Sequence, residues 1–324
     1  MIKRTLDISQ GPSFLCVEND QLVLSRRKVE IGRFPIEDIG VLLIDHPAVT
    51  YTHSVFTRLG HHGAAVVLCG ANHLPASVVL PMEDNDLTAR RLHVQAAAPL
   101  PLRKRLWKQI IRKKVRLQAA NLPPGHPSHG RLMALADEVR SGDPANIEGQ
   151  AARLYWPALL GKEFRRDPEG LPPNGLLNYG YMVMRAAVAR ALVAAGLHPV
   201  FALHHRNRNN AFALADDLVE VLRPRIDRAV VGLLPEGGGM VDKAAKTAIL
   251  SILAEEVKLG DQKGPLMVQL HRLAGSLMRC YEGQAKRLDF PVFPASTTQS
   301  DSPTPARDAP EGGFLLPSGP EDER

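Results

Sequence analysis

Three carboxylates lie close together in the segment 200–224, which reads VFALHHRNRNNAFALADDLVEVLRP. If the second half of this segment is helical, Asp216, Asp217 and Glu220 fall within roughly 100° of arc on the helical wheel. The apolar residues of the same half point the other way, toward a core: Leu214, Leu218, Val221 and Leu222. Carboxylates this close repel one another unless a cation lies between them, so the spacing predicts a cation site.

Two histidines come just before the acidic helix. His204 and His205 each offer an imidazole nitrogen, and a histidine with two or three carboxylates is a ligand set for a divalent metal. The imidazole favours Mn²⁺ over Mg²⁺, because Mg²⁺ prefers a shell made only of oxygen. Acids at this spacing are also typical of a solvated helix face, so the metal site needs support from a second motif.

That second motif is the segment 146–155, which reads NIEGQAARLY. We expect a helix here that begins at Asp143 and Pro144, with Asp143 as the N-cap and Pro144 in the first turn. Together the two segments resemble one family, the CRISPR-associated integrase that is the catalytic subunit of the spacer-acquisition complex. The Asn-rich run HHRNRNN is similar to the type II version of this family.

The resemblance covers roughly residues 1–290 and implies a set of site residues. An E-G-x-A-A-R-x-Y helix of the family supplies one metal-binding glutamate, here Glu148. A histidine followed by an L-A-x-D-L-x-E-x-x-R-P helix supplies the others, here His205, Asp217 and Glu220. Glu148, His205 and Glu220 are then the expected catalytic residues, with Asp217 as a further metal ligand. The His and Asp doublets leave His204 and Asp216 as alternatives one position away.

The resemblance also implies an activity and partners. In this family the 3′-hydroxyl of a short double-stranded DNA fragment attacks the repeat of a CRISPR array, and the fragment is joined there for antiviral defence. The reaction is a transesterification that uses Mg²⁺ or Mn²⁺ and needs no ATP. The expected partners are a second copy of the chain in a homodimer, a small ferredoxin-like adaptation protein and the type II effector nuclease.

Two other functions fit the same residues. The first is a metal-dependent nuclease for branched or single-stranded DNA, in which water is the attacking group. The second is a basic DNA-binding protein without catalysis, whose acids are surface groups. A nucleophilic Ser or Cys triad has no support, because none of these residues lies in a convincing local motif.

The site must be positioned by an α+β fold, with a β-rich N-terminal domain and a larger all-α catalytic domain. With 324 residues and 44% hydrophobic content, the chain is long enough for two domains. Residues 1–81 are expected to form the β domain and to pair subunits. Within it, we predict a hairpin of residues 14–17 and 21–25, and a short helix over residues 52–59. A polar hinge is expected at residues 82–90.

The remaining chain is predicted to be mostly helical. Residues 91–290 form the expected catalytic domain, in which 176–195 is a helix buried in protein rather than a membrane span. Two further helices are predicted near 241–259 and 265–288. The Pro-rich tail 291–324 is predicted to be disordered. Three widely separated cysteines and an N-terminus without a signal-peptide core indicate a cytoplasmic protein that contacts no membrane.

Charge favours a polyanionic partner. The formal charge is +6, and because the tail 291–324 carries −4, the body carries +10. Residues 102–118 hold eight basic residues and no acid, so this helix is expected to bind DNA phosphates without reading sequence. The predicted DNA contacts are Arg103, Lys108 and Arg112 on this helix, with Arg165 and Arg166 in the loop 162–175.

Overall fold

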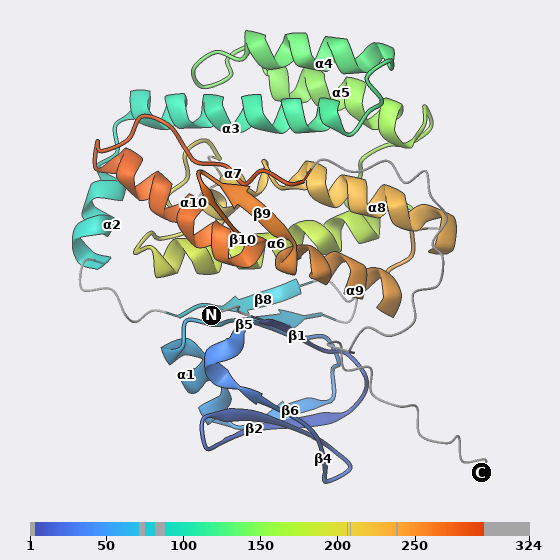
Figure 1. The fold of residues 1–324 in the computed structure, drawn as a ribbon, viewed down its shortest axis with the longest axis vertical. Helices are drawn as coiled ribbons and strands as arrows, with labels where there is room; N and C mark the ends of the chain where they lie inside the picture. The colour runs from blue at the N-terminus through green and yellow to red at the C-terminus, as the bar shows by residue number, and fades with distance from the viewer. Residues whose placement is uncertain are drawn as a thin grey trace. The chain divides into compact units, whose positions relative to one another are not determined.

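A computed structural model describes residues 4–70, 75–81, 88–205, 207, 209–237 and 239–294 (Figure 1). Most of the predicted hinge, 82–87, lies outside these residues, and so does the predicted tail from 295 onward. The fold is α+β as predicted, with strands in the N-terminal part and helices in most of the remainder.

The first sheet has the strand order β1 (Arg4–Ile8), β5 (Ile39–Ile44), β7 (Ala65–Cys69) and β8 (Pro75–Val79). The first three strands are parallel, and β8 runs antiparallel to β7. All six residues of β5 are buried, because its alternate side chains enter two different cores. Val41 and Leu43 pack in the core formed with the helices, whereas Leu42 and Ile44 pack in a smaller core within the β-rich part.

The second sheet has the order β4 (Val29–Pro35), β3 (Gln21–Arg26), β2 (Ser13–Glu18) and β6 (Val49–Tyr51). The predicted hairpin is confirmed as β2 and β3, joined through Asn19 and Asp20 at φ of 48° and 58°. The predicted short helix is confirmed as α1 (His53–His61), which packs against β2 and β7.

Helices make up most of the chain after residue 88 (Figure 1). They are α2 (Thr88–Ala96), α3 (Leu100–Ala120), α4 (Pro127–Glu138), α5 (Ile147–Leu160), α6 (Asn174–Ala194), α7 (Ala213–Val219), α8 (Arg223–Gly237), α9 (Lys243–Ser251) and α10 (Leu266–Tyr281). The helix predicted over 176–195 is confirmed as α6, which packs against α7, α8, α9 and α10. No helix in the described ranges combines the length and apolar composition that a bilayer crossing requires.

The helix predicted over 241–259 is wrong in its second half. Helix α9 ends at Ser251, and a short 3-10 turn (Ile252–Ala254) leads into a hairpin of β9 (Glu256–Leu259) and β10 (Gln262–Pro265). Val257 and Leu259 alternate with exposed residues, and Gly260 at φ of 60° makes the turn. The prediction of an all-α catalytic domain is therefore wrong, because this part also contains the two-stranded β9–β10 hairpin.

The two parts of the described chain are in direct contact. Helix α6 packs against β7 and β8, and Arg190 on α6 donates a 2.5 Å hydrogen bond to the carbonyl oxygen of Gly63. The described residues up to Phe293 form one compact unit, and the predicted domain boundary at residue 81 stays a prediction.

Close approach of α6 to α8 depends on Gly180. A Cβ added there would overlap the Cγ2 methyl group of Ile226, so we expect Gly180→Ala to lower the free energy of unfolding by about 1–3 kcal/mol. Gly232 on α8 is the matched control, because it is exposed and faces open space. There alanine should stabilise the protein by up to about 1 kcal/mol through helix propensity. Urea denaturation measures both variants, and equal effects would contradict this packing.

Candidate functional site

Glu148 lies in the first turn of α5, which is held by two side-chain caps. The Asn146 amide oxygen accepts a 3.1 Å hydrogen bond from the Gly149 N–H, and Asn146 itself takes a left-handed φ of 51°. The Asp143 carboxylate accepts hydrogen bonds from the N–H groups of Ile147 and Glu148, at 2.9 and 3.0 Å. The predicted start of this helix at Asp143 and Pro144 is therefore wrong. Asn146 is the N-cap, and Asp143 caps the helix from outside.

Lys114 brings two distant carboxylates together. It lies on α3, and its Nζ is 2.7 Å from Oε1 of Glu148 and 2.5 Å from Oε2 of Glu220. The side chains of Lys114 and Glu220 are only 9% and 3% exposed, whereas that of Glu148 is 30% exposed. The structure thus places Glu148 and Glu220 around one point, and that point is occupied by a positive charge.

Glu220 lies at a break between two helices. Helix α7 ends at Val219 and α8 begins at Arg223, so the single helix predicted here is interrupted at Glu220. Arg223 forms an ion pair with Oε1 of Glu220 at 3.0 Å, while Lys114 donates a hydrogen bond to Oε2. Burial alone would raise the pKa of Glu220, but these two cations outweigh it and lower the pKa. Glu220 is therefore a buried carboxylate that is held ionised.

The three acids predicted to share one helix face bind different partners. Asp216 forms an ion pair with Arg185 of α6, at 2.7 Å. Asp217 is fully buried and accepts hydrogen bonds from the N–H groups of Leu203, His204 and His205, at 2.6, 3.1 and 3.3 Å. The three acids therefore do not bind one shared ligand, because the arc of roughly 100° that separates them on the helix lets each reach a different group. All three still lie near enough to His205 to raise its pKa.

Asp217 orients His205. Its Oδ1 lies 2.6 Å from Nδ1 of His205, and because Asp217 already accepts from three backbone N–H groups, Nδ1–H is the fitting donor in this contact. This hydrogen bond raises the pKa of His205, although burial opposes the rise. The Nε2 atom is then the nitrogen left to act as a ligand, and the carboxylate behind the ring is the arrangement that commonly supports a metal-bound histidine.

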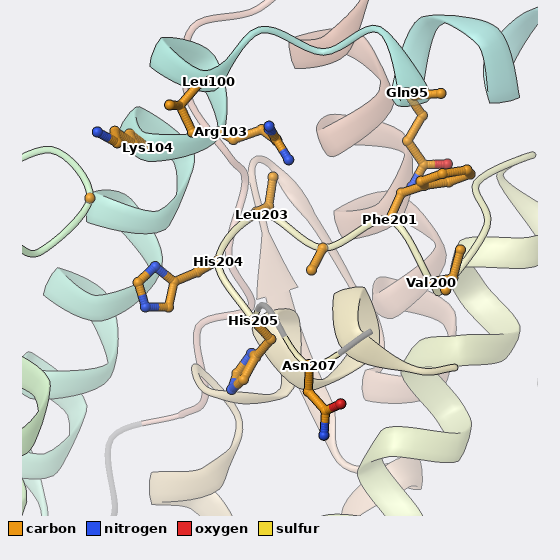
Figure 2. Close-up of a pocket in the computed structure, with 13 residues that line it drawn as sticks. Gln95, Leu100, Arg103, Lys104, Val200, Phe201, Leu203, His204, His205 and Asn207 are labelled. Carbon is orange, nitrogen blue, oxygen red and sulfur yellow. The ribbon is translucent and has the colours of Figure 1, made fainter. Parts of the chain in front are cut away.

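The histidine doublet is divided between two roles. The His204 ring stacks on Trp107 of α3, with a centroid distance of 4.3 Å and an interplanar angle of 1°. The two histidine rings are 6.3 Å apart and turned by 77°, and Figure 2 shows them leaving the loop in different directions. The geometry therefore favours His205 over His204 as a partner of the carboxylates.

A cavity of about 680 Å³ opens beside the histidines (Figure 2). Its lining includes His204, His205 and Asn207 on one segment and the basic residues Arg103 and Lys104 on α3. A cavity with cationic groups on one wall and an imidazole on another is suited to a phosphate-bearing ligand.

Most of the other residues predicted to contact DNA instead bind groups of the protein itself. Arg112 pairs with Asp137 of α4 at 2.5 Å, so the basic helix is neutralised in part from a neighbouring helix. Arg165 donates to the backbone carbonyl oxygen of Lys162. Arg166 donates to Asn174 and Asn178, and Lys108 is half-buried on α3. Of this predicted set, the structure places only Arg103 in the cavity wall.

Lys114 is the site residue that the sequence reasoning missed, because it was counted among the phosphate-binding charges of its helix. A signal was present in the spacing. Lys114 follows Trp107, Ile110 and Ile111 by seven, four and three positions, so it belongs to the buried face of α3. A lysine on an apolar helix face needs an acidic partner.

The side chains fit a divalent ion in their chemistry. Two carboxylates and an imidazole Nε2 suit Mn²⁺ or Mg²⁺, and both carboxylates already converge on a cation, the ammonium of Lys114. Within the described residues, no three His, Cys, Asp or Glu side chains are arranged to hold a metal at once. The carboxylates are thus in place around a positive charge that is not a metal.

A buried network of hydrogen bonds connects the helices around the site. Tyr155 on α5 and Tyr181 on α6 both donate hydrogen bonds to Asp227 on α8, that from Tyr155 at 2.9 Å. Asn121 at the end of α3 donates to the Tyr155 hydroxyl and to the carbonyl oxygen of Pro224, both at 2.7 Å. These contacts connect α3 and α5, which carry Lys114 and Glu148, with α6 and with α8, which begins three residues after Glu220.

The chain is similar in sequence to a known protein family. The family model described as CRISPR associated protein Cas1 matches residues 6–242. A protein of Neisseria meningitidis named CRISPR-associated endonuclease Cas1 is 34% identical over 296 residues, which cover 90% of this chain and 96% of the relative. A Pyrobaculum aerophilum protein, CRISPR-associated endonuclease Cas1 2, is 25% identical over 76% of this chain and 88% of its own length.

Two solved structures share the fold at low sequence identity. A casposase bound to integration product has a TM-score of 0.74 at 20% identity, covering 88% of this chain and 92% of that one. A chain of a Cas6-RT-Cas1–Cas2 complex has a TM-score of 0.72 at 17% identity, covering 88% of this chain and 35% of that one.

Asp227 should make stability depend on pH. Burial raises the pKa of this carboxyl to about 6 from 3.8, although hydrogen bonds from Tyr181 and Tyr155 oppose the rise. Between those two values the folded protein binds more protons than the unfolded chain, so the free energy of unfolding falls as the pH rises. The full loss, about 2–3 kcal/mol, is reached above pH 6.

Urea denaturation from pH 4 to pH 7 tests this expectation. Asp227→Asn should lose that part of the downward slope, whereas Asp261→Asn, in an exposed turn, should keep it. Identical slopes in the wild type and Asp227→Asn would contradict the assignment.

Proposed function

The chain belongs to the CRISPR-associated protein Cas1 family, and from this premise we propose that it is a metal-dependent DNA integrase that inserts short DNA fragments into a CRISPR array. The observation that carries the proposal is the convergence of Glu148 and Glu220 on one cation position, beside a histidine oriented by Asp217. The names of the relatives, which are endonucleases, support chemistry on the phosphodiester bond.

Each residue has a distinct part in the proposed reaction. Glu148, Glu220 and the Nε2 atom of His205 would hold Mn²⁺ or Mg²⁺, and Asp217 would keep the His205 ring in the required tautomer and orientation. A bound divalent ion supplies positive charge to the phosphate and lowers the pKa of the attacking hydroxyl. Arg103 and Lys104, on the cavity wall, would bind neighbouring phosphates and position the strand.

In the proposed strand transfer, the 3′-oxygen of the incoming fragment forms a bond to a phosphorus atom of the repeat. The phosphodiester bond from that phosphorus to the preceding 3′-oxygen breaks, and the departing strand leaves with a 3′-hydroxyl. The proton of the attacking hydroxyl passes to solvent, and the departing oxygen takes up a proton. One bond is exchanged for a similar one, so no ATP is needed.

Hydrolysis by the same site is the second candidate function. If water replaces the 3′-hydroxyl, the site becomes that of a nuclease, and the relatives' name, CRISPR-associated endonuclease, favours such an activity. A purely structural DNA-binding role finds less support, since surface acids would not converge on one buried ammonium.

The assembly is also part of the proposal. We expect a homodimer that works in the cytoplasm with a small ferredoxin-like adaptation protein and the type II effector nuclease. A solved structure of similar fold comes from a complex named Cas6-RT-Cas1–Cas2. Phe14, Val29 and Tyr51 are exposed on strands of the second sheet, which supports pairing through the β-rich part.

Glu148→Gln tests the proposed chemistry. The amide keeps the shape of the side chain but loses the charge that a metal requires, so strand transfer should fall by about a hundredfold or more. Glu138→Gln, an exposed substitution on α4, is the matched control and should keep wild-type activity. The assay follows labelled DNA fragments into a plasmid that carries a repeat, with Mn²⁺ or with EDTA.

The products of this assay separate the candidate functions. Joined strands support the integrase, and hydrolysed ends alone support the nuclease. Undiminished joining in Glu148→Gln, or in EDTA, would contradict a metal site at Glu148.

A further inference from the structure

Lys114 is a buried lysine that the proposed reaction does not use. Its ammonium is removed from water on the apolar face of α3 and is stabilised by its acidic partners Glu148 and Glu220. Its Nζ donates to both carboxylates, at 2.7 and 2.5 Å, which is the geometry of an ammonium held between two anions. Lys114 therefore occupies the position between the two carboxylates that the proposed metal would use.

The ammonium and a divalent ion would need the same place. Nζ lies within 2.7 Å of an oxygen of each carboxylate, and an ion bridging Glu148 and Glu220 would lie about 2.0–2.2 Å from such oxygens. The two positions overlap, so both cations cannot be present together.

The balance of charge leads to the same conclusion. The formal charges of Glu148 and Glu220 are cancelled by those of Lys114 and Arg223. A divalent ion added to this set would meet two positive groups at close range, and their repulsion would weaken its binding. Arg223 binds the other oxygen of Glu220, so it can stay in place while Lys114 withdraws. The flexible stem of a lysine allows such a movement without a shift of its helix.

We propose that Lys114 is an internal cation that holds Glu148 and Glu220 together in the metal-free protein and leaves its position when a divalent ion binds. This inference rests on the proposed metal site and adds to it a positioning residue that sets metal affinity. Removal of the Lys114 charge should then have two opposite effects. The metal-free protein becomes less stable, because two carboxylates lose their cation, whereas the metal binds more tightly, because its competitor is gone.

Calorimetric titration of the full chain with Mn²⁺ at pH 8 tests the proposal. Lys114→Met should bind Mn²⁺ about tenfold more tightly or better than the wild type, since a positive charge next to the ion has been removed. Lys114→Arg keeps the charge and should gain no affinity. Lys246→Met is the matched control, because Lys246 is also buried and paired, with Asp45, in another part of the fold. It should lose stability without any gain in Mn²⁺ affinity.

The outcomes separate this inference from the proposed function. Glu148→Gln should bind Mn²⁺ more weakly than the wild type. If it binds equally well, or if the wild type binds no Mn²⁺, the metal site is wrong and the inference about Lys114 is overturned with it. If Glu148→Gln binds weakly while Lys114→Met binds no more tightly than the wild type, the metal site stands and only the inference is overturned.

A second measurement uses the wild-type protein, so it does not depend on a variant that lacks the buried charge. In the wild type, acetylation of the Lys114 amine by acetic anhydride is followed by mass spectrometry with and without Mn²⁺. Displacement by the ion should raise Lys114 acetylation several-fold and leave that of Lys246 unchanged. No rise at Lys114 at saturating Mn²⁺, or an equal rise at both lysines, would overturn the proposal.

Discussion

The contact on which the site depends is that of one ammonium with two carboxylates. Lys114, Glu148 and Glu220 come from three segments far apart in the chain, and the two buried members, Lys114 and Glu220, would each be unstable in their surroundings alone. The fold places them together through the caps of α5, the break between α7 and α8, and the hydrogen bonds that Tyr155 and Tyr181 donate to Asp227. The site is therefore a product of tertiary packing and not of any one motif.

The charges around this contact are arranged in two zones. Inside, Lys114 and Arg223 neutralise the carboxylates, and Asp217 fixes His205 without joining them. Outside, Arg103 and Lys104 line a cavity that opens next to the imidazole. The inner zone suits a small cation and the outer zone a phosphate chain, which is the combination that phosphoryl chemistry on DNA requires.

Local patterns in the sequence predicted much of the fold but only part of the site. The β2–β3 hairpin followed from Asn19 and Asp20, and α6 from its long apolar run, because both signals are short-range. The helical wheel placed Asp216, Asp217 and Glu220 on one face, but it could not show that each pairs with a different residue, Arg185, His205 and Lys114 in that order. Lys114 was not predicted to belong to the site because it is one of eight basic residues on its helix. Its acidic partners also lie far away in the sequence, on α5 and at the break between α7 and α8. The β9–β10 hairpin was missed although Val257, Leu259 and Gly260 carried its alternation and turn.

The most direct test of the account is a crystal of the protein soaked in Mn²⁺, with anomalous diffraction recorded at the manganese edge. We expect one anomalous peak bound by Glu148, Glu220 and the Nε2 atom of His205, with the Lys114 ammonium moved out from between the carboxylates. No peak at this position, or a peak elsewhere while Lys114 still bridges Glu148 and Glu220, would contradict it.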